Sequence, residues 1–325
     1  MAPRVSVILN CYNHAPYVAE AVESVLNQTF ADLELILIDN GSTDGTRAVL
    51  ERYDDPRIRR FFHDENQSLS KRLNEGVAAT KGEFVAVLYS DDWMLSDKIA
   101  RQVRMFEKLP DDYGVVYCPA LGFNHHTGET WQHPSFALNG VILPSMLERH
   151  FSGPIDMSSP LTRREAFVRY PFYEDLRFEG EAVFMRIALA YRFHFDPDPT
   201  VVLRDIGTNI GKAIQPNHEM SMEVMARLKA MPEVPRSLHQ TIERFSAEIL
   251  KMHAWVVIRT DPDQAAWSKP RFLQAIKFNP KNALSPRLIT GLVLASLPSR
   301  LRHRANGLGN KMRKHPANRS LVEKY

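Results

Sequence analysis

Two adjacent carboxylates, Asp91 and Asp92, follow a continuous apolar run at residues 85–88 and precede Trp93. A short apolar run of this kind predicts a fully buried strand. In an open α/β sheet, ligands bind at the carboxyl ends of the parallel strands. Two acids at such an end suit a hard divalent cation, which prefers oxygen ligands. Aspartate is also a favoured helix N-cap, so spacing alone leaves a metal site and a helix cap equally open.

The elements that must position this pair follow an alternating pattern over the first 118 residues. Short apolar runs predict strands, and apolar residues at helical spacing predict the helices between them. This alternation is typical of a mostly parallel sheet whose strands are joined by right-handed crossovers. The predicted strands are residues 5–9, 33–38, 58–62, 85–88 and 115–117. The predicted helices begin near Pro16, Thr46, Leu69 and Asp97.

The pattern changes after residue 118, where the predicted elements become shorter. Strands are expected at residues 157–159 and 200–203, and helices at residues 163–170 and 180–191. Beyond Gly211 the chain predicts helices without strands, at residues 220–231, at residues 238–259 and after Pro286.

Three histidines, His125, His126 and His133, lie in a turn-rich stretch at residues 122–134. Zinc sites usually pair histidines with cysteines or with a second histidine on the same helix, and neither partner is present in this stretch. We therefore predict a loop that faces solvent or a substrate, and not a zinc site.

Composition places the chain among ordinary globular proteins. It has 325 residues, of which 44% are hydrophobic and 24% charged. The net charge of +3 is too small to argue for a nucleic-acid partner, and two cysteines make no disulfide framework, which fits a reducing compartment. No signal peptide and no stretch of ~18 apolar residues is expected. Residues 298–325 hold eight Lys/Arg and one Glu, which suits either an anionic membrane surface or a solvated tail.

Three motifs in order, at residues 6–13, 21–30 and 39–46, resemble the start of family 2 glycosyltransferases. The resemblance continues through Asn66, Ser70, Asn74 and Gly82 to the pair Asp91 and Asp92, close over residues 4–110 and looser over 155–210. Members of that family are inverting enzymes with the GT-A fold that use nucleotide-diphosphate sugars. The resemblance therefore implies a GT-A type α/β fold, with a mostly parallel, Rossmann-like sheet flanked by helices.

The resemblance also implies roles for individual residues. Asp92 would bind Mn²⁺ or Mg²⁺, and Asp91 would contact the ribose or sugar of the donor. Such a cation neutralises the charge that develops on the leaving diphosphate. The loop after the first strand, with Asn10 and Tyr12, would hold the base, and Tyr12 would pack on its ring. Asp39 lies beside the base-reading position.

The chain departs from the family pattern at four positions. Asn40 stands where the family usually has the carboxylate that reads uracil, and Tyr89 replaces a frequent Asp. Leu73 stands where an Arg is frequent, so Arg72 or Lys71 is the expected substitute in donor binding. Ile206 replaces a frequent His. Together these departures favour an altered donor choice.

An inverting transfer also needs a general base that takes the proton of the acceptor hydroxyl. In the family an acid before a helix of the second half does this. Alignment on the Gly-acid-Ala sequence places Glu181 at that position, with Glu179 as second candidate. Both acids would also favour a helix N-terminus electrostatically, which is the alternative explanation for them.

The expected protein is a cytoplasmic glycosyltransferase of the hexosyltransferase type, acting in cell-surface polysaccharide synthesis. It would move a sugar, from a UDP-sugar by preference, to a glycan or lipid-linked glycan hydroxyl, with a basic tail near the inner face of the plasma membrane. Residues 1–118 would bind the donor, residues 119–211 the acceptor, and residues 212–325 would form a helical extension.

Two other classes compete with this expectation. A catalytically inactive GT-A protein would keep the nucleotide pocket without turnover. A nicotinamide dehydrogenase would share the alternating strands and helices, but the G-x-G-x-x-G pattern after the first strand is missing.

Overall fold

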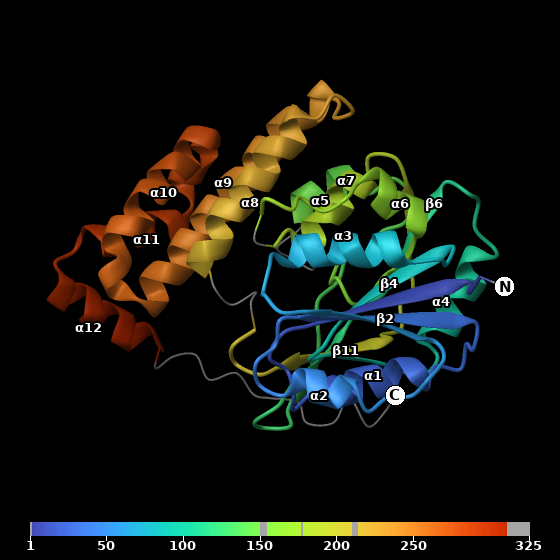
Figure 1. The fold of residues 1–325 in the computed structure, drawn as a ribbon. Coiled ribbons are helices and arrows are strands. Elements are labelled where there is room, and N and C mark those ends of the chain that lie inside the picture. Colours follow the sequence, from blue (N-terminus) through green and yellow to red (C-terminus); the bar gives the residue numbers. More distant parts are fainter. Residues whose placement is uncertain (1, 150–154, 177, 210–213, 311–325) are drawn as a thin grey trace. The chain divides into compact units, whose positions relative to one another are not determined.

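A computed structural model describes residues 2–149, 155–176, 178–209 and 214–310 (Figure 1). The chain divides into two compact units, Met1–Gly207 and Thr208–Ala317. The expected donor half, residues 1–118, and the expected acceptor half, residues 119–211, both fall in the first unit, except for residues 208–211. The second unit is made of helices, and each unit has a hydrophobic core of its own.

The first unit is built on a seven-stranded sheet in which β1, β2, β3 and β4 run parallel. Strand β9 lies antiparallel between β4 and β6, so the sheet is mostly but not fully parallel. The strands, in spatial order, are β10 Arg192–Phe195, β6 Tyr113–Tyr117, β9 Leu161–Arg163, β4 Phe84–Tyr89, β1 Val5–Cys11, β2 Leu33–Asn40 and β3 Ile58–His63.

A smaller four-stranded sheet lies in the same unit. Its strand β5 follows the Asp91–Asp92 pair directly, and β11 pairs with it antiparallel. The strands, in spatial order, are β5 Trp93–Met94, β11 Val201–Asp205, β7 Leu121–Asn124 and β8 Thr130–Gln132.

Helices cover both faces of the main sheet, with α1 and α2 on one side and α3 on the other (Figure 1). Because side chains alternate along a strand, Val7 and Leu9 belong to the core cluster that contains residues of α1 and α4. Ile8 faces α3, where a Cβ added to Gly76 would lie 2.7 Å from its Cγ2 atom. The helices are α1 Val18–Leu26, α2 Thr46–Leu50, α3 Leu69–Ala79, α4 Lys98–Phe106, α5 Leu143–Arg149, α6 Arg164–Arg169 and α7 Val183–Ile187.

Within its described residues, the second unit packs five helices around a small apolar core. Phe272 and Leu288 are fully buried at its centre, together with Leu250 and Ile258 of one long helix. The helices are α8 Ile214–Ala230, α9 Arg236–Thr260, α10 Ala265–Phe278, α11 Pro286–Ser296 and α12 Ser299–Asn310. Among the described residues, none of these helices has the length and apolar character needed to cross a membrane.

The predicted strands and helices of residues 5–117 are confirmed, but several later predictions are wrong. The stretch at residues 122–134 forms most of the β7–β8 hairpin and not a loop. Residues 157–159 form a turn, in which Ser159 N–H donates to Asp156 O, and the strand begins at Leu161. The α-helix expected from residue 180 begins at Val183, since Gly180 has a left-handed φ of 57° and opens a short 3₁₀ turn.

Besides the β7–β8 hairpin, the sequence analysis did not anticipate five elements: β5, α5, β10, α10 and α12. Helix α10 contains Pro270 inside it, and a proline within a helical pattern usually indicates a helix end or a kink, so the sequence gives a poor helix signal there. Strand β10 is short and exposed at Arg192, so its apolar pattern is weak.

Candidate active site

The expected site residues gather at the carboxyl edge of β1, β2 and β4. Strand register places Cys11 opposite Asp39 and Asn10 opposite Tyr89, so the polar residues that end these three strands are neighbours. The loops that follow β1 and β2 meet at the same edge as the Asp91–Asp92 pair.

Asp92 is a buried carboxylate held by donors from two other segments. Ser158 Oγ donates to its Oδ2 atom at 3.1 Å, and Arg204 N–H donates to its Oδ1 atom at 3.0 Å. Burial, with a further contribution from the charge of Asp91, raises the pKa of Asp92 well above its usual range. Among the described residues, no Lys or Arg side chain forms an ion pair with Asp92. A bound cation would supply the missing positive charge.

The alternative explanation of the pair as a helix cap is wrong. Helix α4 begins at Lys98 with Asp97 at its N-cap position, and strand β5 lies between the pair and that helix. Asp92 N–H instead donates to Tyr89 O in a tight turn. The position of Asp91 and Asp92 is therefore set by the end of strand β4 and not by helix α4. This agrees with a ligand site at the carboxyl end of a strand.

Arg204, at the end of β11, fixes the backbone around the pair. Its Nε donates to Asp91 O at 2.9 Å, and another guanidinium nitrogen pairs with Glu20 of α1. The guanidinium also lies 4.6 Å from the ring centroid of Trp93 and 5.3 Å from that of Tyr17. The sequence analysis did not single out Arg204, because these partners lie more than 100 residues away along the chain.

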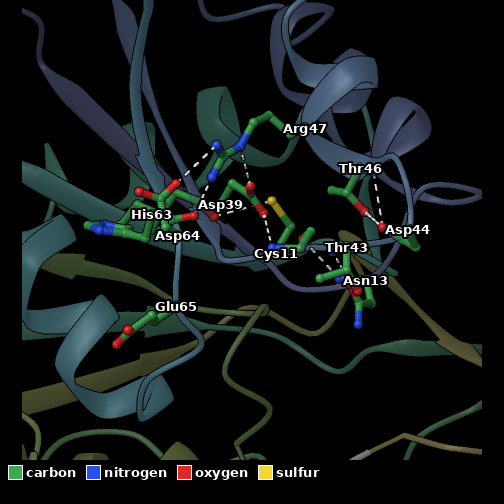
Figure 2. A network of polar contacts seen from close by, with 12 residues as sticks. Cys11, Asn13, Asp39, Thr43, Asp44, Thr46, Arg47, His63, Asp64 and Glu65 are labelled. Atoms are coloured by element: carbon green, nitrogen blue, oxygen red, sulfur yellow. Dashed lines mark hydrogen bonds and ion pairs between the residues drawn. The ribbon is translucent and has the colours of Figure 1, made fainter.

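The loops after β1 and β2 are joined by a series of hydrogen bonds (Figure 2). Asn13, with a left-handed φ of 54°, donates its N–H to Ser42 Oγ and accepts from Thr43 N–H at 2.8 Å. His14 N–H donates to Thr46 Oγ1, and its Nδ1 atom lies 2.8 Å from Ser90 Oγ, next to the carboxylate pair. This rigid loop leaves the Tyr12 ring 40% exposed.

Asp39 and Asn40 point to opposite faces of the sheet. Asp39 is fully buried on the α2 side, where Arg47 Nε donates to its Oδ2 at 3.0 Å and Ser42 N–H to its Oδ1 (Figure 2). Arg47 continues to His63 O and Asp64, so it ties α2 to the end of β3. Asp39 thus holds the loop that carries residues 42–46.

Asn40 uses its whole amide within the protein. Its Nδ2 donates to Asn66 Oδ1 and Gln67 O, and its Oδ1 accepts from Gln67 N–H and Arg72 Nε at 3.0 and 2.8 Å. Arg72 is itself buried, and also pairs with Glu75 and donates to Glu65 O. In this arrangement both residues position the segment after β3.

Among the described residues, Asn10 carries the one buried side-chain polar atom of the predicted donor set that has no hydrogen-bond partner. Its Oδ1 atom is buried and accepts no hydrogen bond from them. An unpaired buried acceptor is costly unless a ligand or water satisfies it. This atom is therefore a candidate acceptor for a ligand at the strand edge.

The two candidates for the general base, Glu179 and Glu181, differ in what the structure describes of them. Both carboxylate oxygens of Glu179 accept from Arg186, at 2.9 and 2.6 Å, and Tyr173 N–H donates to Oε2. A buried carboxylate paired in this way is poorly suited to accept a further proton. Glu181 lies in the 3₁₀ turn Gly180–Ala182, and its side chain lies outside the described part of the chain.

The three histidines do not form a metal centre in the described part of the structure. His125 stacks edge-on against Tyr17 at 5.1 Å, and His126 Nε2 lies 3.4 Å from Ile206 O. Across the described residues, no group of three or more His, Cys, Asp or Glu could hold a metal by itself. A cation at Asp92 would therefore need oxygens from its ligand and from water, as is usual for Mg²⁺ with phosphates.

Comparison with known proteins identifies the fold and the family. The family model described as glycosyl transferase family 2 matches residues 6–178. The putative teichuronic acid biosynthesis glycosyltransferase TuaG of Bacillus subtilis is 30% identical over 174 residues, which are 50% of this chain and 69% of TuaG. An uncharacterized glycosyltransferase of Rickettsia typhi is 36% identical over 117 residues, and this chain spans only 36% of its length.

Two solved structures share the fold over almost the whole chain. Staphylococcus aureus TarS 1–349 in complex with UDP has a TM-score of 0.65 at 17% identity, covering 97% of this chain and 93% of that one. The mannosyltransferase PcManGT of Pyrobaculum calidifontis, in complex with GDP-Man and Mn²⁺, has a TM-score of 0.59 at 18% identity, covering 97% and 89%. The expected GT-A fold is confirmed.

Proposed function

Because the chain belongs to glycosyl transferase family 2, we propose that it moves a hexosyl group from a nucleotide-diphosphate sugar to a hydroxyl group, with inversion. The observation that carries this proposal is the buried Asp91–Asp92 pair at the end of β4, beside the joined loops after β1 and β2. A UDP-sugar is the favoured donor. The acceptor would be a glycan or lipid-linked glycan in cell-surface polysaccharide synthesis, in keeping with the name of TuaG.

Mn²⁺ or Mg²⁺ fits the donor set at this edge. Asp92 would hold the ion, and Asp91 would contact the ribose or sugar of the donor. When bound, the ion acts as a Lewis acid on the leaving diphosphate. PcManGT is described with Mn²⁺, which supports the same class of ion here. The chain contributes a carboxylate preset by Ser158 and Arg204, so that little reorganisation is needed on binding.

Tyr12 and Asn10 are the proposed contacts for the base. The exposed ring of Tyr12 can stack on any base, and the buried Asn10 Oδ1 can accept a base or ribose donor. We propose that Asp39, Asn40 and Arg72 act mainly by fixing the loops around the base, since their polar atoms already bind the protein.

Glu181 is the proposed general base. It lies two residues from Glu179, whose ion pair with Arg186 anchors the start of the 3₁₀ turn. In this proposal Glu181 takes the proton of the acceptor hydroxyl while the sugar is transferred. A lipid-linked acceptor would be presented at a membrane surface, so the enzyme would act in the cytoplasm beside the inner face of the plasma membrane.

Calorimetric binding of UDP, GDP, dTDP and CDP, each with Mn²⁺ or with EDTA, tests the site. We expect one nucleotide to bind only with Mn²⁺, and Asp92→Asn to weaken it by at least about a hundredfold, as loss of a charged ligand predicts. Asp97→Asn, at the nearby α4 N-cap, is the matched control and should bind normally. Binding by the folded Asp92→Asn variant at wild-type strength would refute the metal assignment.

Glu181→Gln tests turnover separately from binding. We expect transfer to fall by roughly 10²–10⁴-fold, the usual contribution of a general base, with unchanged affinity for the nucleotide. Unchanged transfer would refute the assignment of Glu181. If the wild-type chain binds a nucleotide but transfers from none of its sugars, the inactive GT-A protein becomes the correct description.

A further inference from the structure

Charge is distributed very unevenly between the two ends of the chain. Residues 1–263 hold 28 Lys/Arg and 37 Asp/Glu, a net charge of −9, whereas residues 264–325 hold 13 and one, a net charge of +12. Residues 264–322 contain no acidic residue at all. The modest overall charge of +3 hides this difference. A one-sided positive segment of this size favours an anionic partner.

The same segment exposes large aliphatic side chains in the second unit. Leu284 ends the 3₁₀ turn Pro280–Leu284 (η5) and is 82% exposed. Ile289 and Val293 of α11 are 47% and 55% exposed, and Leu301 of α12 is 50% exposed. Single exposed aliphatic residues are common, but four within 18 residues of one basic segment are a feature that needs a partner.

Helix α11 is apolar on two sides. One side, with Leu288 and Leu294, is buried in the core, and Gly291 packs so closely that an added Cβ would lie 2.3 Å from the Phe272 ring. Ile289 and Val293 are four residues apart and so share the other, exposed side. With 11 residues, α11 is about 16 Å long, about half the thickness of a bilayer core. Such a helix can lie on a membrane but cannot cross it.

Helix α12 is fixed to the same unit by buried polar contacts. Arg302 donates to Leu294 O at 3.1 Å and to Leu297 O at 2.7 Å, which closes the end of α11. Asn306 Nδ2 donates to Ile258 O at 2.8 Å. Since Arg302 faces inward, its neighbours Arg300, Leu301 and Arg304 are exposed. The basic and aliphatic residues therefore belong to a built surface and not only to a tail.

We propose that this surface, formed by η5, α11 and α12, docks on an anionic membrane. The aliphatic side chains would enter the boundary between headgroups and acyl chains, and the basic side chains would contact lipid phosphates. A single-stranded nucleic acid is disfavoured, because proteins that bind single strands stack the bases on aromatic rings and not on aliphatic side chains. The aliphatic residues are Leu284, Ile289, Val293 and Leu301, and the exposed basic residues are Lys281, Arg287, Arg300 and Arg304.

Sedimentation of the full chain with lipid vesicles tests the proposal. Vesicles of phosphatidylcholine alone should leave the protein in solution, and vesicles that also contain phosphatidylglycerol should bind it, less so at high salt. Ile289→Ser with Val293→Ser should weaken this binding by about tenfold or more, because the apolar area buried in the membrane is lost. Arg300→Glu with Arg304→Glu should also weaken vesicle binding, because acidic side chains are repelled by the anionic lipid headgroups.

Matched controls lie in the first unit. Val141→Ser with Val168→Ser removes aliphatic side chains that are 72% and 56% exposed, and Arg104→Glu with Lys108→Glu reverses two exposed charges. Both controls should bind vesicles like the wild type. All four variants change exposed residues, so circular dichroism should show a retained fold.

Three results would overturn the proposal: no binding of the wild type to anionic vesicles, full binding by the aliphatic variant, or binding to double-stranded DNA in place of vesicles. Transfer to a soluble acceptor should be unchanged in the aliphatic variant. Vesicle binding needs no turnover, so this proposal and the proposed transferase function can fail independently.

Discussion

At the scale of the residue, Asp39 and Asn40 are neighbours in sequence with different surroundings. Strand alternation turns Asp39 toward Arg47 on the α2 side and Asn40 toward Arg72 on the α3 side. The orientation of the Asn40 amide is determined, because Gln67 N–H and Arg72 Nε can only donate to it. At the position where the family usually has a carboxylate, the amide of Asn40 therefore has a structural role, because it holds the segment after β3.

Asn40→Asp should destabilise the fold by about 1–3 kcal/mol, since a carboxylate cannot donate to Asn66 Oδ1 and Gln67 O. Urea unfolding at pH 7 measures the effect. Asn27→Asp, at an exposed position after α1, makes the same chemical change without these partners and should have little effect. Equal stability of Asn40→Asp and the wild type would show that the amide donors are dispensable.

Tyr12→Ala should weaken nucleotide binding without loss of stability, because the ring is 40% exposed. Stacking of a base on an aromatic ring contributes about 1–3 kcal/mol, so the dissociation constant should rise by roughly 5- to 150-fold. Tyr12→Phe keeps the ring and should keep most of the affinity. Calorimetry with the nucleotide that binds the wild type provides the comparison, and an unaffected Tyr12→Ala would exclude stacking.

At the scale of the element, α8 and α9 meet at a pair of histidines. His218 Nδ1 lies 3.0 Å from His253 Nδ1, and the His218 ring packs edge-on against Trp267 of α10. One nitrogen must donate and the other accept, so the contact requires at least one neutral ring. Burial lowers the pKa of both His218 and His253 to about 4.

Stability of the second unit should therefore fall as the pH drops from about 6.5 toward 4. In this window the unfolded chain takes up protons that the folded pair does not, so acid favours unfolding. Each pKa unit corresponds to about 1.4 kcal/mol, which predicts a loss of a few kcal/mol. His253→Gln should reduce the slope of stability against pH, because it removes one of the two buried histidines. Urea midpoints at pH 7 and pH 5, measured for the wild type and for His253→Gln, would give the two slopes. Equal slopes would contradict a role of the histidine pair in the pH dependence of stability.

At the scale of the whole molecule, the two units have separate cores and opposite charge. The first is centred on alternating strand residues such as Val7, Leu35 and Leu88, and the second on Phe272 and Leu288. The proposed nucleotide site lies wholly in the first unit, and the proposed membrane surface wholly in the second. Each property should thus respond to changes in its own unit.

Calorimetry of thermal unfolding should show more than one transition. A nucleotide with Mn²⁺ binds only the folded first unit, so at a hundred times its dissociation constant it should stabilise that transition by about 2.7 kcal/mol. The transition of the second unit should stay in place, and the His253→Gln variant should affect only that one. A single transition that ligand and variant both shift would mean that the units unfold together.

The sequence alone predicted the elements of residues 5–117 other than β5, because buried strands and amphipathic helices leave local patterns of apolar residues. The family and the site at the carboxyl edge were implied by the resemblance of its motifs. It failed where elements are short or irregular: in the β7–β8 hairpin, at β9, and in α10, which contains Pro270. In those places the stabilising contacts come from residues that are distant in the sequence, so no local pattern of apolar residues indicates the element.

Tertiary structure alone decided which polar residues have atoms left for a ligand. The sequence named Asn10, Asp39, Asn40 and Arg72 for donor binding and Glu179 as the second candidate for the general base. Packing paired Glu179 with Arg186 and Asn40 with Arg72, and left Asn10 Oδ1 unpaired among the described residues. It also brought Ser158 and Arg204 to Asp92. A hydrogen bond depends on distance in space, whereas a sequence pattern depends on distance along the chain.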